Sequence, residues 1–507
     1  MIDTDNSDAK RAAWDLLVVG GGTAGIVGAQ TAASLGARVL LVERDRTGGD
    51  CLWTGCVPSK SILAAAAAAA DARAASRFGV HAGDIRVDFI QVMKHVHEAI
   101  AAIAPTDSPA ALEAAGVRVT AGNLTFTGPH TARITNAGNT AEQSVTFAQA
   151  MLATGSEPAI PPIDGIGSAQ ALTSDNIWDL TSLPARLVVL GGGSIGCELG
   201  QAFARLGSQV TIIEAAVRLL PGEDAAASAV ITDVLTGEGI RVLTGSAVAA
   251  VSTPAAAHAT ARDATQAPAN GGRLTLEDGS EIDYDELLVA SGRAPRTAGL
   301  GLSAAGVELD RHGFVVVDRH LRTTNRCIWA AGDLTGHPQF THTAGVHASL
   351  AASNAILGLR RRVDTAAIPR VTFTQPEVAA VGVSTDRAYS RGDLLLLEWR
   401  HDHLDRAVTD AATQGFTRLV VDGKGKVRGA TVVGPRAGET LGELTLAIRL
   451  GLRTRDLAST THAYPTYNDG LWNAAIADVR SRLTAPTATR ATKALAALRR
   501  RRVRGWQ

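Results

Sequence analysis

Apolar runs and helix-like stretches alternate along the first half of the chain. Residues 16–19, LLVV, are uniformly apolar, which is typical of a strand buried on both faces of a parallel sheet. The stretch IVGAQTAASLG that follows has helical character, and ARVLLVE predicts a second strand. The same order recurs at residues 186–214, where RLVVL and later SQVTIIE are the apolar runs. The pattern predicts two strand–helix–strand units and an α/β fold.

Glycines at matching places make the first unit a dinucleotide-binding segment. Gly20, Gly22 and Gly25 spell G-x-G-x-x-G, and Glu43 ends the second strand 18 residues after Gly25. Such glycines let the backbone approach a pyrophosphate at a helix N-terminus, and the acid binds a ribose hydroxyl.

The second unit repeats the signature with Gly191, Gly193, Gly196 and, again 18 residues later, Glu214. A flavin and a nicotinamide explain two sites most simply, because one cofactor must pass electrons to the other. The alternative is that one copy has degenerated. A carboxylate at residue 214 repels a 2′-phosphate and favours NADH over NADPH, although Arg218 lies near enough in sequence to weaken that preference.

A close cysteine pair lies between the two strand–helix–strand segments. The segment GGDCLWTGCVPSK, residues 48–60, holds Cys51 and Cys56, and the chain has only two other cysteines. A structural disulfide, half of a metal site and a redox-active dithiol are all compatible with the pair by itself.

Length and charge bound the architecture. A chain of 507 residues is expected to form two to four domains. The polar N-terminus has no apolar signal region, and the alanine-rich residues 62–70 are too short and too weakly apolar to span a bilayer, so we expect a cytoplasmic protein. From residue 480 onward there are nine Lys and Arg and no acid, whereas the rest carries 40 bases against 49 acids.

Taken together, these motifs resemble those of the FAD-dependent pyridine nucleotide–disulfide oxidoreductases, over about residues 15–480. The matching stretches are the two fingerprints, G-G-x-C-x-x-x-x-C-x-P-S-K, ATGSEP, SGRAP, IWAAGD and VTFTQPEVAAVG. The resemblance implies an FAD domain (1–157 and 290–363), an NAD(P) domain (158–289) and an α+β dimerisation domain (364–480) that forms a homodimer. Residues 481–507 are left as a basic tail, and residues 253–272 as a loop inserted in the NAD(P) domain.

The resemblance also implies roles for the site residues. Cys51 would exchange with the external acceptor, and Cys56 would lie against the flavin as the charge-transfer thiolate. Lys60 and Glu198 would form an ion pair near flavin N5, the alternative being a surface lysine and an unrelated helix-face glutamate. The cofactor-binding residues implied are Gly20, Gly22, Gly25, Glu43, Gly49, Asp50, Lys60, Gly155, Gly292 and the ribityl-binding Asp333 for FAD, and Gly191, Gly193, Gly196, Glu198 and Glu214 for NADH.

The physical chemistry of the cysteine pair agrees with a redox role. A cysteine at a helix start has its thiolate stabilised by the helix dipole. A zinc site needs further thiol or imidazole ligands, and the sequence offers no partner pair, so no resident metal is expected. A purely structural disulfide is unexpected in a reducing compartment. Cys197 and Cys327 are interpreted as small buried residues.

The chain departs from the family near its C-terminus, where residues 461–469 read THAYPTYND. Thiol-reducing members have H-P-T-x-x-E, whose histidine is the acid–base catalyst. Here Tyr464 takes the place of the histidine and Asp469 that of the glutamate, and a phenol is a poor base at neutral pH. His462, two residues upstream, either substitutes or is structural. Mercuric reductases are more similar here, but this chain has no cysteine after Cys327 for their C-terminal pair.

Three hypotheses follow. The first is an NADH-oxidising flavoenzyme whose dithiol reduces an acceptor other than a standard disulfide, such as a metal ion or a quinone. The second is a dihydrolipoyl dehydrogenase, or another disulfide reductase, with a relocated base. The third is a flavoprotein that binds or senses redox partners and is tethered by its tail.

The tail has two interpretations of its own. Residues 487–504 predict a helix, with Leu495 and Leu498 followed by four arginines. It is either a solvated extension or an attachment to an anionic membrane surface, which would make the enzyme membrane-peripheral and place it beside quinones. Nucleic acid is not an expected partner.

Overall fold

The computed structural model describes residues 14–136, 142–252 and 271–504. It divides into two compact units, unit 1 with residues 1–215 and 238–363, and unit 2 with residues 216–237 and 364–507. Most of the loop expected at 253–272 lies outside the described residues.

The first sheet of unit 1 has the strand order β3-β2-β1-β6-β5-β4, with β16 also paired to β6. Strands β3, β2, β1, β6 and β16 run parallel, and β5 and β4 extend the sheet antiparallel. The bounds are β1 (Trp14–Val19), β2 (Val39–Glu43), β3 (Val117–Ala121), β4 (Asn123–Gly128), β5 (Thr131–Thr135), β6 (Glu142–Leu152) and β16 (Ile328–Ala330).

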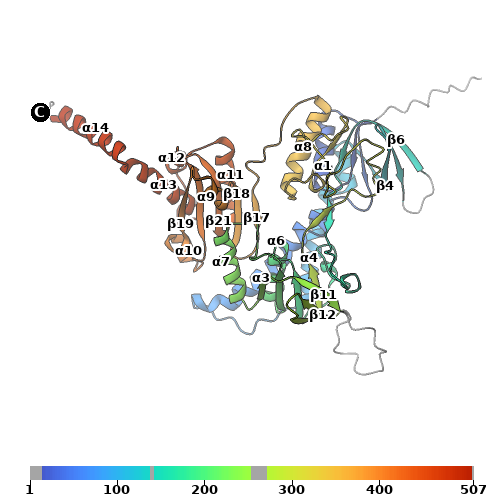
Figure 1. Cartoon of the computed structure of the whole chain (residues 1–507), viewed down its shortest axis with the longest axis horizontal. Helices are drawn as coiled ribbons and strands as arrows, with labels where there is room; N and C mark the ends of the chain where they lie inside the picture. Colours follow the sequence, from blue (N-terminus) through green and yellow to red (C-terminus); the bar gives the residue numbers. More distant parts are fainter. Residues whose placement is uncertain (1–13, 137–141, 253–270, 505–507) are drawn as a thin grey trace, which may run out of the picture. The chain divides into compact units, whose positions relative to one another are not determined.

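The continuous apolar run in β1 is explained by burial on both of its faces. Leu16 and Val18 pack into one core with the helices α1 (Thr23–Ser34) and α8 (Thr341–Leu357), which lie side by side (Figure 1). Leu17 and Val19 pack into a second core, which includes Phe126 of β4. The strand ends at Gly20, so the glycine-rich loop opens at the carboxyl edge of the sheet, where ligands bind in such folds.

The second parallel sheet of unit 1 has the order β10-β9-β8-β14 and carries the second glycine loop. Its strands are β8 (Arg186–Leu190), β9 (Gln209–Glu214), β10 (Arg241–Thr244) and β14 (Glu286–Val289). A three-stranded antiparallel sheet, β11 (Val248–Ser252), β12 (Gly272–Leu276) and β13 (Glu281–Tyr284), and the pair β7 (Ser156–Pro158) and β15 (Arg293–Pro295) complete the strands.

The cysteine pair lies on two consecutive helices of unit 1. Cys51 lies in α2 (Gly49–Trp53), and Cys56 is the first residue of α3 (Cys56–Ala74), an alanine-rich segment with proline in its first turn, where proline is tolerated. Helix α3 packs against α6 (Ser194–Leu206), which begins at the second glycine loop. The helices α4 (Phe89–Ile103) and α5 (Pro109–Ala114) follow α3.

Unit 2 is an antiparallel sheet covered by helices. The strand order is β17-β18-β21-β20-β19, with the bounds Arg370–Thr372, Glu377–Gly382, Val427–Gly434, Phe416–Asp422 and Leu394–Arg400 in that order. Its helices are α7 (Ala225–Gly237), α9 (Thr385–Arg391), α10 (Asp405–Thr409), α11 (Ala437–Leu450), α12 (Thr454–Ser459), α13 (Asp469–Thr484) and α14 (Pro486–Arg504). Residues Glu223 and Asp224, just before α7, are held to this unit by two ion pairs. Buried Asp224 accepts from Arg418 at 2.5 Å, and Glu223 pairs with Arg370 at 2.6 Å.

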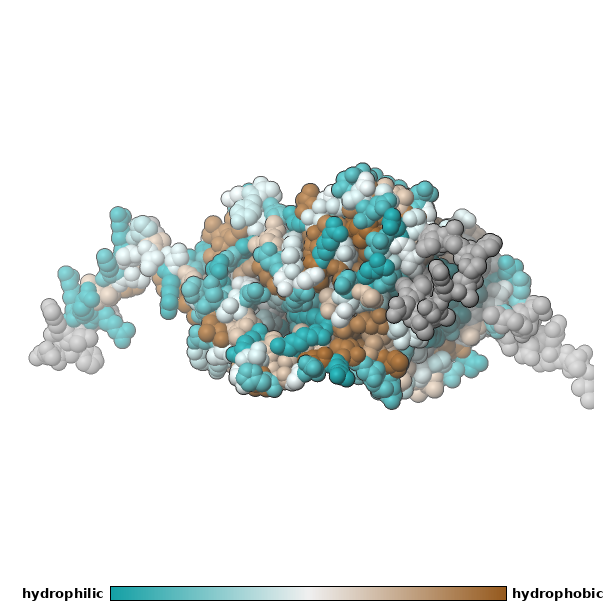
Figure 2. Space-filling view, turned by 90° about the horizontal axis from the view of Figure 1, so that it is seen from below, coloured by the Kyte–Doolittle hydropathy of each residue, from teal (hydrophilic) through white to brown (hydrophobic). Residues whose placement is uncertain are grey.

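Two predictions about structure are confirmed. The α/β class with two parallel nucleotide-type sheets and a separate α+β unit is present, and the expected tail helix is α14. Figure 2 shows α14 at the left edge, coloured mainly hydrophilic to intermediate. Over residues 14–136, 142–252 and 271–504, no helix has both the length and the apolar character that a bilayer crossing requires.

Candidate active site

The first glycine loop folds tightly onto its own helix. Gly20 has φ +103°, and a Cβ there would lie 2.5 Å from the Ala153 carbonyl oxygen. A Cβ on Gly25 would lie 1.8 Å from the Gly20 carbonyl oxygen. The backbone N–H of Gly21 donates to the Glu43 carboxylate at 2.5 Å. Only glycine fits these approaches, so the loop leaves bare backbone facing the cavity beside it.

The second glycine loop repeats this geometry. Gly191 has φ +116°, and a Cβ on Gly196 would lie 1.9 Å from the Gly191 carbonyl oxygen. Gly192 N–H donates to Glu214 at 2.7 Å, and Gly193 is the N-cap of α6. The two loops therefore share one backbone design, which is the physical reason that their sequences match.

Arg218, near Glu214 in sequence, is engaged within unit 2. Its guanidinium donates to the carbonyls of Pro221 and Glu223 and lies 3.5 Å from the Asp386 carboxylate.

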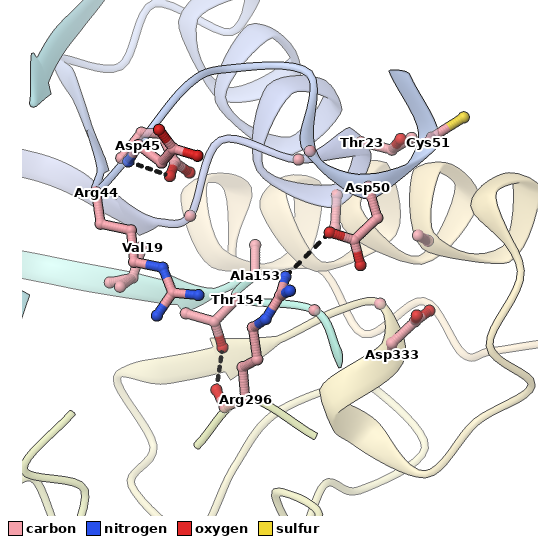
Figure 3. A pocket seen from close by; sticks show the side chains of 18 of the residues that line it. Val19, Thr23, Arg44, Asp45, Asp50, Cys51, Ala153, Thr154, Arg296 and Asp333 are labelled. Atoms are coloured by element: carbon pink, nitrogen blue, oxygen red, sulfur yellow. Dashed lines mark hydrogen bonds and ion pairs between the residues drawn. The ribbon is translucent and has the colours of Figure 1, made fainter. Parts of the chain in front are cut away.

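A cavity of about 560 Å³ connects the first glycine loop to the cysteine pair (Figure 3). The residues expected to bind FAD that line it are Gly20, Gly22, Glu43, Gly49, Asp50, Gly155 and Asp333. A Cβ on Gly49 would lie 2.6 Å from the Cα of Gly22, so the cysteine-bearing segment packs directly on the glycine loop. Gly292 has φ +139° and accepts from Ala159 N–H at 2.9 Å, beside the cavity wall.

The two cysteines line one end of this cavity. The Cys56 sulfur lies 3.3 Å from the Thr341 hydroxyl, at the start of α8. A hydrogen bond from Cys51, aided by Thr341 and the positive charge of Lys60, lowers the pKa of Cys56 to about 6. The same hydrogen bond and burial raise the pKa of Cys51. Cys56 is thus set to be the thiolate and Cys51 the thiol at neutral pH.

Lys60 and Glu198 form the expected ion pair. Lys60 Nζ donates to Glu198 Oε2 at 2.7 Å, and the glutamate side chain is only 8% exposed. The pair joins α3 to α6, so it links the cysteine helix to the helix of the second glycine loop. A buried carboxylate needs such a partner, which favours the paired interpretation over that of two unrelated surface groups.

The expected Asp50 and Asp333 belong to a polar network in the cavity whose other members, Ser156, Arg293 and Arg296, sequence reasoning did not assign. Asp333 accepts from Ser156 Oγ at 2.6 Å, and burial raises the pKa of this carboxylate. Arg293 donates to Ser156 Oγ at 2.7 Å and to Asp50, and Arg296 donates to Asp50 at 3.0 Å. Both arginines lie in the stretch SGRAPR, residues 291–296, whose first five residues match the family and could have drawn attention to them. No sequence pattern indicated Thr341.

The C-terminal motif lies in unit 2, where its polar side chains have separate partners. The Tyr464 side chain is exposed, and its hydroxyl donates to Asp405 at 2.5 Å, which raises the pKa of the phenol. The His462 side chain is 5% exposed, with its Nε2 3.0 Å from a carboxylate oxygen of Glu443.

Asp469 is also buried, and it accepts from Thr466 N–H at 3.0 Å, closing the turn before α13. Its other carboxylate oxygen has no hydrogen-bond partner among the described residues. Among those residues, no group of three or more His, Cys, Asp or Glu side chains is arranged to hold a metal ion.

Comparison with known proteins agrees with this geometry. The family described as pyridine nucleotide-disulphide oxidoreductase matches residues 14–348, and its dimerisation domain matches residues 368–475. The mercuric reductase of Streptomyces lividans is 38% identical over 467 residues, covering 90% of this chain and 94% of that protein. The dihydrolipoyl dehydrogenase of Geobacillus stearothermophilus is 35% identical over 460 residues, covering 90% and 94%.

A solved structure has the same fold over nearly the whole chain. It is the Cu(II) complex of the HOCl-induced flavoprotein disulfide reductase RclA from Escherichia coli, with a TM-score of 0.80 and 26% identity. It covers 92% of this chain, which covers 99% of that one.

The described residues fit the cofactor that these relatives imply. The bare backbone of the first loop, the Glu43 carboxylate and the length of the cavity toward Cys56 suit an FAD. FAD, when bound, takes hydride equivalents from a nicotinamide and exchanges electrons with the dithiol. The expected enzyme class, the FAD and pyridine nucleotide cofactors and the dimer-forming domain are confirmed. The chain belongs to the pyridine nucleotide–disulfide oxidoreductase family of FAD-dependent enzymes.

Proposed function

We propose that this enzyme oxidises NADH and passes the electrons through FAD and the Cys51/Cys56 dithiol to a metal ion, with a quinone as the second candidate acceptor. The observation that carries the proposal is the contrast between a thiolate-prone Cys56 and a C-terminal motif without the usual histidine. Cys56 has a pKa of about 6, while the Tyr464 hydroxyl donates a hydrogen bond to Asp405, which raises the pKa of the phenol.

The number of protons that must be transferred favours a metal ion over a disulfide as the electron acceptor. Reducing a disulfide releases two thiolates, at least one of which must be protonated as it leaves, and this is the task of the family's histidine. Reducing a metal ion consumes electrons only, and the one thiol proton of the reduced pair, on Cys51, passes to solvent as the disulfide re-forms. The names of two relatives, a mercuric reductase and a Cu(II) complex of RclA, agree with a metal acceptor.

The roles proposed for individual residues follow the same path. Cys51 exchanges with the acceptor and Cys56 faces the flavin, while Lys60 and Glu198 orient the nicotinamide side. Asp333 and Glu43 bind the ribityl chain and the ribose of FAD. His462 is proposed as structural, because its ring is buried against Glu443.

The nucleotide is proposed to be NADH. Glu214 already accepts from Gly192 N–H at 2.7 Å, so a carboxylate stands where a 2′-phosphate would have to fit. Arg218 is engaged by Pro221, Glu223 and Asp386, which supports the same preference. The expected domains are 1–157 with 290–363 for FAD, 158–289 for NADH and 364–480 for dimerisation. The basic tail 481–507 is proposed to attach the enzyme to an anionic membrane surface.

A steady-state acceptor screen tests the proposal. NADH and NADPH are supplied in parallel with Hg(II), Cu(II), a soluble quinone, lipoamide and glutathione disulfide, and Cys51→Ser is the control for uncatalysed reduction. We expect NADH-dependent turnover with a metal ion that Cys51→Ser abolishes. Turnover greatest with lipoamide would overturn the proposal in favour of a dihydrolipoyl dehydrogenase. Absence of turnover with every acceptor in an FAD-loaded protein would favour a redox-sensing module.

A further inference from the structure

Asp50 places a carboxylate in a part of the cavity that must receive an anion. It is the second residue of α2, and the residue before it packs against Gly22 of the first glycine loop. Gly20, Gly22, Thr23 and Asp50 line the same cavity. That loop and the N-terminus of α1 are where an FAD diphosphate binds, so Asp50 faces a ligand of its own charge.

The cavity as a whole is acidic before any ligand enters. Its charged lining residues are Glu43, Asp45, Asp50, Asp175 and Asp333 against Arg44, Arg46, Arg293 and Arg296. The diphosphate of FAD adds two negative charges. Each unpaired carboxylate near it therefore weakens binding unless a cation stands between them.

Arg296 is placed to supply that cation. In Figure 3 its side chain reaches toward Asp50, between Thr154 and Asp333. Its Nη1 donates to Asp50 at 3.0 Å, and its Nη2 lies 3.5 Å from an Asp175 oxygen. Its Nε is buried beside Glu157, at 3.6 Å, but each Nη carries a second N–H, so the guanidinium retains donor capacity toward the cavity that it lines.

The position of Arg296 is fixed by its backbone. The Arg296 carbonyl accepts from Thr154 Oγ1 at 2.6 Å, and the side chain is only 22% exposed. Arg293, the other arginine beside Asp50, is held by Ser156, whose hydroxyl and carbonyl it contacts at 2.7 and 3.0 Å. Both arginines line the cavity and pair with Asp50, but Arg293 has side-chain anchors at Ser156 that Arg296 lacks.

We propose that Arg296 is a positioning residue for FAD that neutralises Asp50 and presents positive charge to the diphosphate, so that the two side chains act as one unit. Asp50 holds the guanidinium in place, and the guanidinium makes Asp50 compatible with the cofactor. The pairing concerns FAD binding and does not depend on which acceptor the enzyme uses.

A double-mutant cycle on FAD affinity tests the unit. FAD is removed from the full-length protein, and rebinding is followed by quenching of flavin fluorescence. Arg296→Gln should weaken FAD binding about 100-fold, because it removes one of the two cations paired with Asp50 and leaves the cavity more negative beside the diphosphate. Asp50→Asn should change binding less than about 5-fold. The Asp50→Asn/Arg296→Gln protein should recover to within about 10-fold of wild type, and this non-additivity is the signature of a coupled pair.

Matched probes separate this role from a merely structural one. ADP carries the diphosphate without the flavin, so Arg296→Gln should weaken ADP binding and leave adenosine binding unchanged. Arg38→Gln removes a guanidinium from the exposed Asp15 pair and should leave FAD affinity unchanged. Arg296→Lys, which keeps the charge, should lose less than about 10-fold. It keeps the idea testable if Arg296→Gln does not fold.

Three results would overturn the proposal. The first is wild-type FAD affinity in Arg296→Gln. The second is a double mutant that binds as weakly as Arg296→Gln, because Arg296 would then act independently of Asp50. Equal losses for ADP and adenosine would assign Arg296 to fold maintenance instead.

Discussion

The cysteine segment in unit 1 and the C-terminal motif in unit 2 follow the family pattern to different degrees. In unit 1 the side chains that the motifs predict to cooperate touch one another, as Lys60 and Glu198 do at 2.7 Å. In unit 2 each predicted side chain has a different partner. Tyr464 donates to Asp405, and His462 contacts Glu443.

This contrast separates electron transfer from proton transfer. The groups that set the thiolate, Cys51, Thr341 and Lys60, all act on Cys56 in the direction that the chemistry needs. The groups beside Tyr464 act in the opposite direction for a base, since Asp405 raises the pKa of the phenol. The chain has therefore kept the means to move electrons and altered the means to move protons.

The largest effect should come from removing the flavin-side sulfur. Two-electron reduction of the wild-type protein should give a long-wavelength charge-transfer band, because the Cys56 thiolate donates to the flavin. Cys56→Ser should bind FAD and lose the band completely, as followed by anaerobic titration in a spectrophotometer. Cys51→Ser is the matched control: it cannot form the disulfide, so it should show the band before reduction, while its flavin is oxidised, and lose it when two electrons reduce the flavin. A band that persists in Cys56→Ser would mean that the two cysteine roles are assigned wrongly.

Placing an imidazole at residue 464 should have the next largest effect, on the rate of lipoamide reduction. Tyr464→His should raise lipoamide reduction, because general acid–base catalysis contributes about 10²–10⁴-fold where the geometry is right. Tyr464→Phe removes the phenol without adding a base and should give no such gain. Rates are compared as kcat/KM at saturating NADH. Wild-type lipoamide turnover that already equals that of Tyr464→His would show that no base is missing.

The Lys60–Glu198 pair should tune the pH dependence of the charge-transfer band. A thiolate exists above its pKa, so the band of the reduced enzyme should be full above pH 7 and fade as the pH falls through about 6. Lys60 lowers the pKa of Cys56 and Glu198 raises it. Lys60→Met should therefore move the midpoint to higher pH and Glu198→Gln to lower pH, each by on the order of one unit. Shifts of the same sign in both variants would rule out this electrostatic origin.

The sequence allowed the local backbone and the paired motifs to be predicted, for a physical reason. A strand, a tight glycine turn and a helix are encoded within about 30 residues, and the close approach of Gly25 to Gly20 forbids other residues. Lys60 and Glu198 are 138 residues apart, and only the family resemblance linked them.

What the sequence did not reveal are contacts whose partners belong to no motif. Thr341 beside Cys56, Asp405 beside Tyr464 and Glu443 beside His462 each come from a distant or unremarkable stretch. A hydrogen bond between two distant side chains leaves no periodic pattern in the sequence from which the partner of a hydroxyl or carboxylate could be predicted. Asp50 and Arg296 lie in or beside motifs, but they are 246 residues apart and nothing in either motif announces their pairing. These contacts between distant side chains could therefore be identified only in the structure.

The smallest effect is expected from the tail, which lies in neither region and should leave both chemistries intact. Helix α14 turns about 100° per residue, so Arg490, Lys493, Arg500 and Arg501 share one side, while Leu495 and Leu498, both more than half exposed, lie on the other. Each base near an anionic membrane is worth about 1 kcal/mol, and salt screens much of this. The two leucines bury little area, so insertion should be shallow.

Co-sedimentation with vesicles of phosphatidylserine and phosphatidylcholine measures this attachment. Full-length protein should sediment several-fold more than a variant ending at Ala485, which keeps the whole of α13, and the excess should shrink from low to physiological salt. Replacing the four consecutive arginines 499–502 by glutamine should reduce binding, whereas Leu495→Ala should have a weaker effect, because charge contributes more than apolar area here. Turnover with a soluble acceptor should be equal in all variants. Equal sedimentation of the full-length and shortened proteins would show that the tail is a solvated extension, and the enzyme would then meet its acceptor in solution.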